Sequence, residues 1–348
     1  MTNKNKKAVA LISGGLDSML AAKVILEQGI HVEGLNFYSG FFGVGSKIIS
    51  AKNPNYNNAQ WIADQLGIKL HVIDVVEEFK DVFLNPKYGY GSQLNPCLDC
   101  KIFIVKKALE WMRQNNFDFV ISGEVIGQRP MSQRRDTMNV VKRDSGAEDL
   151  LLRPLCAKHF PETKAEREGW VAREKLLDFV GRDRKPQIAL AAKYGFKHFP
   201  QPAGGCLLTE PNFAARIKDL WNRVGARRAV PKNKDYTLDE INLLKVGRHL
   251  RPRPHFKLII GRDQKENEFL ERFQDKYISL HCVDFPGPLV LVDGEVTAEE
   301  LKLAAQITAR FSKAQGEVLA QIDPLQKQPY QLKIKPLAMQ EVLLDWYV

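Results

Sequence analysis

The chain has 348 residues, of which 44% are hydrophobic and 26% are charged. This composition is typical of a globular protein, and the length is sufficient for two domains. It excludes an intrinsically disordered chain, a collagen and a small disulfide-stapled protein. No apolar run approaches the roughly 18 residues that a membrane span needs, and no signal-peptide core follows the basic N-terminus. We therefore expect a cytoplasmic protein.

The net charge of +10 is concentrated in one part of the chain. Residues 1–100 and residues 230–348 are each neutral overall, whereas residues 101–229 hold 25 basic and 15 acidic residues, and 14 of the 25 are Arg. Arginine pairs with phosphate through two parallel hydrogen bonds, so an Arg-rich segment favours a polyanionic partner such as nucleic acid. The alternative is a solvated helical face.

The first part of the chain alternates between strand and helix patterns. Short apolar runs predict parallel strands with helices between them, and therefore a sheet with helices on both faces. Ligands of such sheets bind at the carboxyl ends of the strands. The strands are expected at 8–12, 31–37, 69–75 and 117–123, and the helices at 16–29, 57–67 and 98–114.

A polar, Pro-containing stretch at 225–240 predicts a domain boundary, with a first domain over 1–228 and a second over 238–348. The second domain is expected to be a small α+β fold. Its strands are predicted at 255–261, 277–283, 288–294 and 330–337, and its helix at 299–313.

The segment Ser13-Gly14-Gly15-Leu16-Asp17-Ser18 joins the first expected strand to its helix. Two glycines let the backbone approach a ligand closely, and the unpaired N–H groups of the helix N-terminus favour phosphate. It is neither a Walker A loop nor a GxGxxG fingerprint. The alternative is an ordinary strand-to-helix turn with Asp17 as its cap.

The five cysteines have no export signal before them, so we interpret them as thiols, ligands or nucleophiles rather than as a disulfide framework. Cys97 and Cys100 form a CxxC pair at a helix start, where the helix dipole and Lys101 are expected to lower the thiolate pKa. Cys206 ends the turn at 202–206. Three cysteines suit either a thiol relay or a cluster with one open iron. Cys156 and Cys282, inside apolar runs, are expected to be inert.

A third polar segment, Ile121-Ser122-Gly123-Glu124-Val125-Ile126-Gly127-Gln128, follows the last strand expected in the first domain. Three motifs now stand in order along the chain: SGGLDS, the NPCxxC of residues 95–100, and this SGExxGQ stretch. With them, residues 8–210 resemble the PP-loop ATPases that thiolate tRNA, which are the 4-thiouridine synthetases and the tRNA 2-thiouridylases. The resemblance implies an adenine nucleotide alpha hydrolase-like fold. Residues 245–313 faintly resemble the RNA-binding domain of the NFACT proteins.

The resemblance implies an ATP-dependent tRNA sulfurtransferase. ATP would adenylate a uridine carbonyl oxygen, sulfur would attack that carbon, and AMP would leave; pyrophosphate is the other product. Sulfur would come from a persulfide carrier or from sulfide. Cys97 and Cys206 would handle it in a persulfide route, whereas Cys97, Cys100 and Cys206 would hold a [4Fe-4S] cluster in the other route, which the CxxC spacing slightly favours.

The same resemblance assigns further residues. Asp17 would act in catalysis and in Mg²⁺ binding. ATP would be held by Ser13, Gly14, Gly15, Asp17, Ser18, Asn36, Gly123 and Gln128. The basic residues that flank these motifs fit a tRNA substrate, namely Arg129, Arg134, Arg135, Arg182, Arg184 and Lys185, with Lys142, Arg143, Arg167 and Arg173 nearby and Arg248, Arg251, Arg253 and Lys257 in the second domain. Those from Arg167 to Lys185 are expected to lie on a helix and its exit.

Two other functions remain open from the sequence. One is a PP-loop ligase or amidating enzyme, such as a deazaguanine-nitrile synthase, for which the cysteines would not matter. The other is an RNA-associated or ribosome-associated protein that only senses nucleotide, which would release no pyrophosphate. The uridine position, the sulfur donor and the oligomeric state are not determined by the sequence.

Overall fold

The computed structural model describes residues 6–42, 58–199, 206–227, 235–326 and 328–348. The chain divides into two compact units between Thr209 and Glu210. This division comes before the end at 228 expected for the first domain. The physical reason is that helix α8 (Pro211–Arg227) contacts α9 (Leu238–Leu244), and Arg216 on α8 donates a hydrogen bond of 2.8 Å to the Leu244 carbonyl.

The N-terminal unit contains a five-stranded parallel sheet in the order β3-β2-β1-β4-β5. The predicted fold class is confirmed, and the expected strands and helices lie within a few residues of their observed bounds. The elements in chain order are β1 Lys7–Leu11, α1 Leu16–Leu26, β2 His31–Tyr38, α2 Asn58–Leu66, β3 Leu70–Asp74, α3 Val76–Leu84, α4 Cys97–Gln114, β4 Phe119–Ile121, α5 Arg135–Asp144, β5 Leu151–Leu152, α6 Lys164–Arg167 and α7 Lys185–Lys193.

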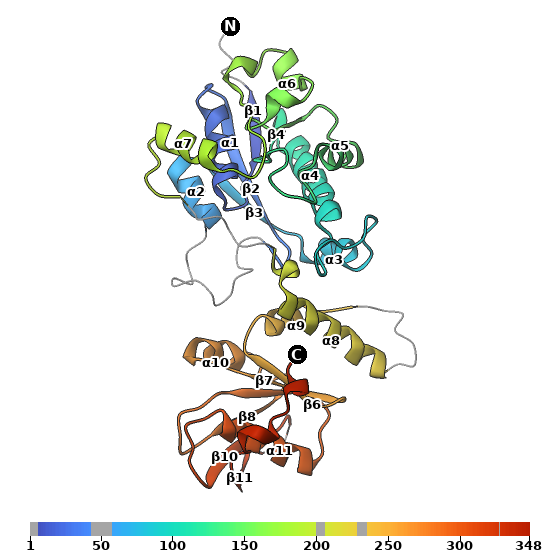
Figure 1. Ribbon diagram of the computed structural model, residues 1–348, viewed down its shortest axis with the longest axis vertical. Helices are drawn as coiled ribbons and strands as arrows, with labels where there is room; N and C mark the ends of the chain where they lie inside the picture. Colours follow the sequence, from blue (N-terminus) through green and yellow to red (C-terminus); the bar gives the residue numbers. More distant parts are fainter. Residues whose placement is uncertain (1–5, 43–57, 200–205, 228–234, 327) are drawn as a thin grey trace. The chain divides into compact units, whose positions relative to one another are not determined.

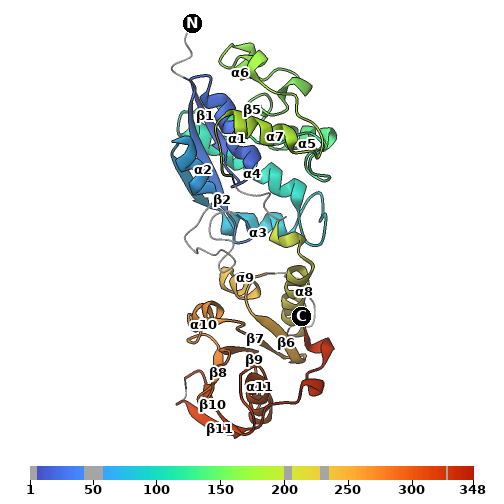
Figure 2. The same ribbon diagram turned by 60° about the vertical axis from the view of Figure 1, so that its left-hand side comes forward.

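Alternation along β1 explains why helices cover both faces of this sheet. Ala8 and Ala10 pack into a core with α1, α2 and α7, whereas Val9 packs into a second core with α4 and α5. Successive strand residues point to opposite faces, so a strand with small apolar residues on both sides is buried on both sides. Figures 1 and 2 both show α1 and α7 side by side, and the two helices are in contact.

The segment from Arg167 to Lys185 was expected to be a helix and its exit, and this expectation is wrong. It holds only the end of α6 and a 3₁₀ turn at Arg173–Lys175 before α7 begins. The short α6 is stabilised by a capping box, in which the Glu166 carboxylate accepts a hydrogen bond of 2.8 Å from the Thr163 backbone N–H.

The C-terminal unit is built on a six-stranded antiparallel sheet in the order β11-β10-β8-β9-β7-β6. Helix α11 packs on one face, and α9 and α10 pack on the other. The remaining elements are β6 Arg248–Arg253, β7 Phe256–Ile260, α10 Gln264–Glu271, β8 Ile278–Cys282, β9 Val290–Gly294, α11 Ala298–Arg310, β10 Val318–Asp323 and β11 Tyr330–Ile334. The predicted α+β class is confirmed.

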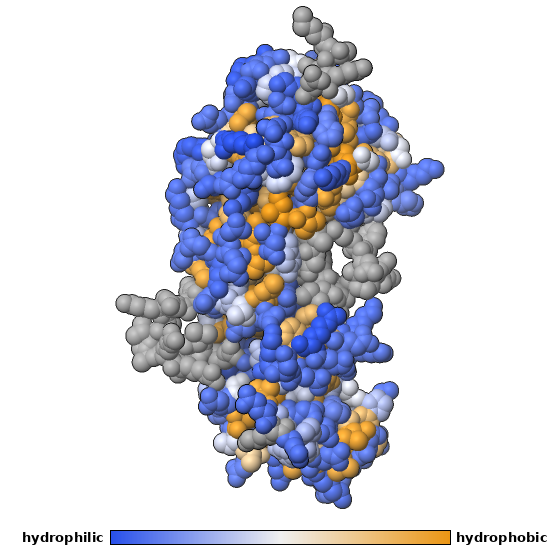
Figure 3. Space-filling model, turned by 180° about the vertical axis from the view of Figure 1, so that it is seen from behind, coloured by the Kyte–Doolittle hydropathy of each residue, from blue (hydrophilic) through white to orange (hydrophobic). Residues whose placement is uncertain are grey.

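The face of the molecule opposite to that of Figure 1 is mostly hydrophilic, with hydrophobic patches on both units (Figure 3). Among the described helices, none is long and apolar enough to span a membrane.

Candidate functional site

The Ser13–Ser18 loop lies where β1 ends and α1 begins. Gly14 has φ +84°, and a Cβ at this position would lie 3.0 Å from Cβ of Asn58 at the start of α2. Glycine is therefore required here both by the left-handed backbone and by the close approach of α2. Gly15 is the N-cap residue and brings no side chain, so the first N–H groups of α1 stay accessible to a ligand. Ser18 is buried and donates a hydrogen bond of 2.7 Å to the Gly15 carbonyl.

The loop that follows β4 packs directly on this helix start. A Cβ on Gly123 would come within 2.6 Å of backbone atoms of Asp17 and Ser18, so only glycine fits. Gln128, from the same loop, donates a hydrogen bond of 2.9 Å to the Asp17 carboxylate. On β2, buried Asn36 donates a hydrogen bond of 2.7 Å to the Ile12 carbonyl beyond β1.

The structure thus brings together all the residues predicted to bind ATP, at the carboxyl ends of β1, β2 and β4. This is the edge at which parallel sheets bind ligands. Their role in binding ATP remains a prediction.

Arg184, which the sequence predicted to bind tRNA, lies at the same place. Its guanidinium is 3.5 Å from the Asp17 carboxylate. The backbone that carries it runs beside the SGExxGQ segment, because Ile126 and Val180 form a parallel bridge and the Gly181 N–H donates a hydrogen bond of 2.7 Å to the Ile126 carbonyl.

The CxxC cysteines occupy the first turn of α4, as predicted. The loop before α4 is tied to the segment of Cys206, because the Leu94 N–H donates a hydrogen bond of 3.2 Å to the Leu208 carbonyl. All three thiols are partly buried and lie close enough for Cys97 and Cys206 to influence the ionisation of Cys100. Folding therefore gathers the three cysteines. The turn residues 202–205 lie outside the described part of the chain.

The expectation of lowered thiolate pKa values is wrong for Cys100. Burial raises its pKa well above the ordinary value, the charges of Cys206 and Cys97 add to this, and Lys101 opposes it only in part. Burial also raises the pKa of Cys206 to about 11, against a lowering by the Leu208 N–H and Arg129. Desolvation of a thiolate outweighs one nearby cation and the helix dipole.

Cys156 and Cys282 are buried, as expected for inert thiols. Burial raises the pKa of Cys156 to about 12, and its thiol donates a hydrogen bond of 3.1 Å to the Glu124 carbonyl.

Glu124, in the SGExxGQ segment, is a central residue of the site for which the sequence predicted no role. It is 2% exposed. It accepts hydrogen bonds of 3.0 Å from Arg153 and 2.8 Å from Ser122, and it pairs with Lys101 at 3.5 Å. Burial alone would raise its pKa, but the charges of Lys101 and Arg153 and the hydrogen bonds lower it to about 2. Nothing in the sequence indicates that Glu124 pairs with Lys101, 23 residues before it, and with Arg153, 29 residues after it.

The pair between Lys101 and Glu124 connects the two halves of the site. Lys101 directly follows Cys100 on α4, and Glu124 directly follows Gly123, which packs on the SGGLDS loop. Arg129, further along the same loop, is near enough to affect Cys206. A continuous set of contacts therefore links the thiols to the glycine loop.

Exposed cations surround these loops. Arg134 pairs with Asp136 at 2.9 Å, Arg135 lies 5.7 Å from the Phe160 ring centre, and Arg129, Arg182 and Lys185 are exposed. Three other basic residues considered for tRNA also pair with carboxylates, Arg143 with Asp144, Arg167 with Asp149, and Arg173 with Glu166.

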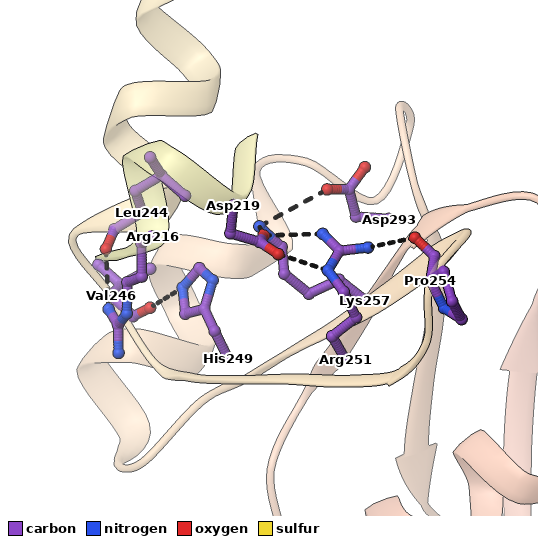
Figure 4. Close-up of polar contacts among 9 residues, drawn as sticks. All are labelled: Arg216, Asp219, Leu244, Val246, His249, Arg251, Pro254, Lys257 and Asp293. Carbon is purple, nitrogen blue, oxygen red and sulfur yellow. Dashed lines mark hydrogen bonds and ion pairs between the residues drawn. The ribbon is translucent and has the colours of Figure 1, made fainter. Parts of the chain in front are cut away.

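In the C-terminal unit, the expectation that Lys257 contacts RNA is wrong. It is 1% exposed and pairs with Asp219 at 3.3 Å and with Asp293 at 3.9 Å (Figure 4). Arg251 donates a hydrogen bond of 2.7 Å to the same Asp219 and another to the Pro254 carbonyl. These cations hold α8 on the sheet. Arg248 lies over the Phe311 ring, and Arg253 is exposed.

No group of three or more Cys, His, Asp or Glu side chains in the described ranges is arranged to hold a metal ion. Cys97, Cys100 and Cys206 are neighbours there, and the cluster that they would hold remains a prediction.

Two family models match this chain, one in each unit. Residues 6–145 match the model of the tRNA methyl transferase HUP domain, and residues 247–347 match the NFACT protein RNA binding domain. The second match extends the faint resemblance expected over 245–313.

Relatives of this chain include tRNA-specific 2-thiouridylases. The tRNA-specific 2-thiouridylase MnmA of Marinomonas sp. (strain MWYL1) is 34% identical over 128 residues, which is 36% of this chain and 33% of the relative. That of Pseudomonas putida (strain W619) is 27% identical over 61% of this chain and 54% of the relative. This chain thus spans from a third to about half of the length of the curated relatives that it matches.

Among solved structures, a 4-thiouridine synthetase–RNA complex with bound ATP is 21% identical, covering 43% of this chain and 36% of that chain with a TM-score of 0.33. The resemblance to the PP-loop tRNA thiouridine synthetases, stated from the motifs, is confirmed by the family model and by the sequence relatives.

Proposed function

We propose that this chain is an ATP-dependent tRNA sulfurtransferase that adenylates a uridine carbonyl oxygen and replaces it with sulfur. The observation that carries the proposal is the set of contacts that joins the three gathered thiols to the glycine loop through Lys101 and Glu124. An enzyme that only adenylates, or a nucleotide sensor, has no need of thiols beside its nucleotide loop. The relatives that are named tRNA-specific 2-thiouridylases support the same activity.

The glycine loop would bind the phosphates of ATP. The backbone N–H groups of Ser13 to Gly15 and the positive end of α1 favour a negative charge, and Gly14 lets the backbone come close to it. Asp17 Oδ1 is buried without a hydrogen-bond partner in the described structure, and a free carboxylate oxygen suits Mg²⁺. Bound there, Mg²⁺ would neutralise charge on the pyrophosphate leaving group.

The uridine oxygen would attack the α-phosphate and release pyrophosphate, which leaves the carbonyl carbon activated by an AMP leaving group. The outer sulfur of a persulfide, held on Cys97 or Cys206, would then attack this carbon, and AMP would depart. The new uridine sulfur would then be bonded to the sulfur of the first cysteine. The second cysteine would attack the sulfur of the first, which releases the thiouridine and forms a disulfide between the two cysteines, and a thiol reductant would reduce this disulfide. In the alternative route, Cys97, Cys100 and Cys206 would hold a [4Fe-4S] cluster whose open iron carries the sulfur.

The tRNA would be held by the exposed cations around the site, Arg129, Arg134, Arg135, Arg182 and Lys185. Arginine and lysine on a folded RNA contact mainly phosphates, and the target base must leave its stack to reach a buried site. The C-terminal unit would contribute a second RNA contact, as its match to the NFACT RNA-binding model supports.

The test is thiolation of unmodified tRNA transcripts by the full chain, with ATP and with a cysteine desulfurase and cysteine as the source of persulfide sulfur. Thiolated nucleosides are measured by mass spectrometry after digestion, and pyrophosphate release is measured in parallel. We expect both products with the wild-type chain. Cys97→Ala and Cys206→Ala should abolish thiolation while ATP still binds.

Cys282→Ala is the matched control, because this cysteine is buried in the other unit. Cys100→Ala separates the two sulfur routes, since a persulfide relay tolerates its loss and a three-cysteine cluster does not. Full thiolation by Cys206→Ala would contradict both routes. Pyrophosphate release without any thiolation by the wild-type chain would favour the amidating or ligase alternative.

A further inference from the structure

Three polar side chains from separate segments meet at the N-terminal end of α1, and their hydrogen-bonding capacity is only partly used. Asp17 Oδ2 accepts a hydrogen bond of 2.9 Å from Gln128 and lies 3.5 Å from Arg184. Asp17 Oδ1, Gln128 Oε1 and Arg184 Nε are each buried without a hydrogen-bond partner in the described structure. Buried polar groups in native proteins are nearly always satisfied, so three such atoms at one place indicate a polar ligand.

The position of Arg184 is set by the fold rather than by the reach of a long side chain. The Ile126–Val180 bridge and the Gly181 hydrogen bond place the backbone before Arg184 beside the SGExxGQ loop. Gly127 has φ +78°, and a Cβ on it would be 3.6 Å from the Gly181 backbone. Arg184 itself forms the N-cap of α7.

The neighbouring basic residues differ from Arg184 in their exposure to solvent. Arg182 and Lys185 are exposed, whereas the Arg184 side chain is 24% exposed and faces the carboxylate of the glycine loop. At 3.5 Å this ion pair is longer than an ideal charge-assisted hydrogen bond, so the guanidinium is not saturated by Asp17.

We infer that Arg184 is a phosphate-binding residue of the ATP site and not a residue of the tRNA surface. A carboxylate alone beside the glycine loop would repel a polyphosphate, and Arg184 compensates that charge. Its planar guanidinium offers paired N–H donors that match phosphate oxygens, including those of the departing pyrophosphate. The inference rests on the proposed function, because it assigns this residue within the same nucleotide site.

The experiment measures two affinities separately on the full chain. Binding of Mg·ATP is measured by calorimetry without RNA, and binding of a tRNA transcript is measured by filter retention without ATP. Arg184→Gln should weaken ATP binding about tenfold or more, as expected for the loss of charge-assisted hydrogen bonds, and should leave tRNA affinity unchanged. Arg184→Lys keeps the positive charge but lacks the paired N–H donors of the guanidinium, and should bind ATP with intermediate affinity.

Arg182→Gln is the control, two residues away and exposed. We expect it to weaken tRNA binding and to leave ATP binding unchanged. Unchanged tRNA binding by Arg184→Gln also shows that the variant is folded. The inference is overturned when Arg184→Gln binds ATP like the wild-type chain, or when it loses tRNA and not ATP. A wild-type chain that binds no ATP would overturn the proposed function itself.

Discussion

At the scale of single residues, the site depends on positions where only one residue type fits. Gly14 and Gly123 show two different reasons for glycine: a left-handed backbone in a crowded turn, and a backbone that packs directly on α1. The cysteines show a different effect, in which the surroundings of a side chain change its acidity. Burial keeps Cys100 and Cys206 protonated at neutral pH in the free protein.

Gly14→Ala should abolish ATP binding. The variant strains a backbone with φ +84° and places a methyl group 3.0 Å from Asn58 at the phosphate loop. Gly29→Ala is the matched control, because Gly29 has φ +78° and nothing within 4 Å of its Cβ. Both variants should lose about 1–2 kcal/mol of stability from the left-handed backbone. Calorimetric titration with Mg·ATP should show binding by the Gly29 variant alone, and equal binding by the two would disprove this role of the loop.

Alkylation of Cys206 should keep accelerating with pH well beyond the range of an ordinary thiol. Only the thiolate reacts, and a pKa of about 11 keeps its fraction small up to that pH. Between pH 8 and pH 10 we expect about a tenfold rise in rate per pH unit, whereas an unperturbed thiol levels off near pH 9. Iodoacetamide labelling followed by peptide mass spectrometry measures this rate. A plateau near pH 9 would show that the thiol is not buried in solution.

At the scale of elements, the site is assembled by a few contacts between segments far apart in the sequence. Lys101 on α4 and Arg153 beyond β5 meet on Glu124, which follows β4. The Leu94–Leu208 hydrogen bond brings the Cys206 segment to the loop before α4. Each helix and strand forms from one continuous stretch of sequence, but the site is made of residues from several of them.

Glu124→Gln should destabilise the N-terminal unit by about 3–5 kcal/mol, because it leaves Lys101 and Arg153 without their buried counter-charge. Glu162→Gln is the control: Glu162 is half-exposed and 3.9 Å from Arg173, and a surface pair contributes at most about 1 kcal/mol. Urea unfolding at pH 7 measures both free energies of unfolding.

The same carboxylate gives a pH dependence of stability with a defined sign. Its pKa falls from 4.5 in the unfolded chain to about 2 in the folded one, so its stabilising contribution is complete above pH 4.5 and disappears as the pH falls towards 2. Glu124→Gln should therefore lose less stability than the wild-type chain across that interval. Parallel pH profiles for the two proteins would contradict the buried ion pair.

At the scale of the whole molecule, the distribution of charge matters more than its sum. The excess of positive charge in residues 101–229 divides into cations used inside the fold, such as Arg153, and exposed cations around the site, such as Arg134 and Arg135. Only the exposed cations can exchange counterions for tRNA phosphates.

Replacing Arg134 and Arg135 together by Ala should weaken tRNA binding and reduce the slope of log affinity against log salt by about 1–2, as expected for two lost phosphate contacts. The double variant Lys69→Ala with Arg113→Ala removes the same charge from exposed residues just before β3 and in the last turn of α4, near the amino ends of the strands, and should leave the slope unchanged. Fluorescence anisotropy at several salt concentrations gives both slopes. Equal slopes for the two double variants would place the tRNA elsewhere.

The sequence by itself determined the parallel α/β sheet, the glycine loop after β1 and the CxxC at the start of α4. The spacing of apolar residues, the turn residues and the residues that begin a helix are all local properties of the chain. It also located the excess of basic residues. Only the tertiary structure decided which of those residues face a partner: Arg184 lies on Asp17, and Lys257 is buried between Asp219 and Asp293. The same holds for Glu124 and for the raised pKa values of the thiols, since charge pairing and desolvation depend on neighbours that the fold brings from distant parts of the chain.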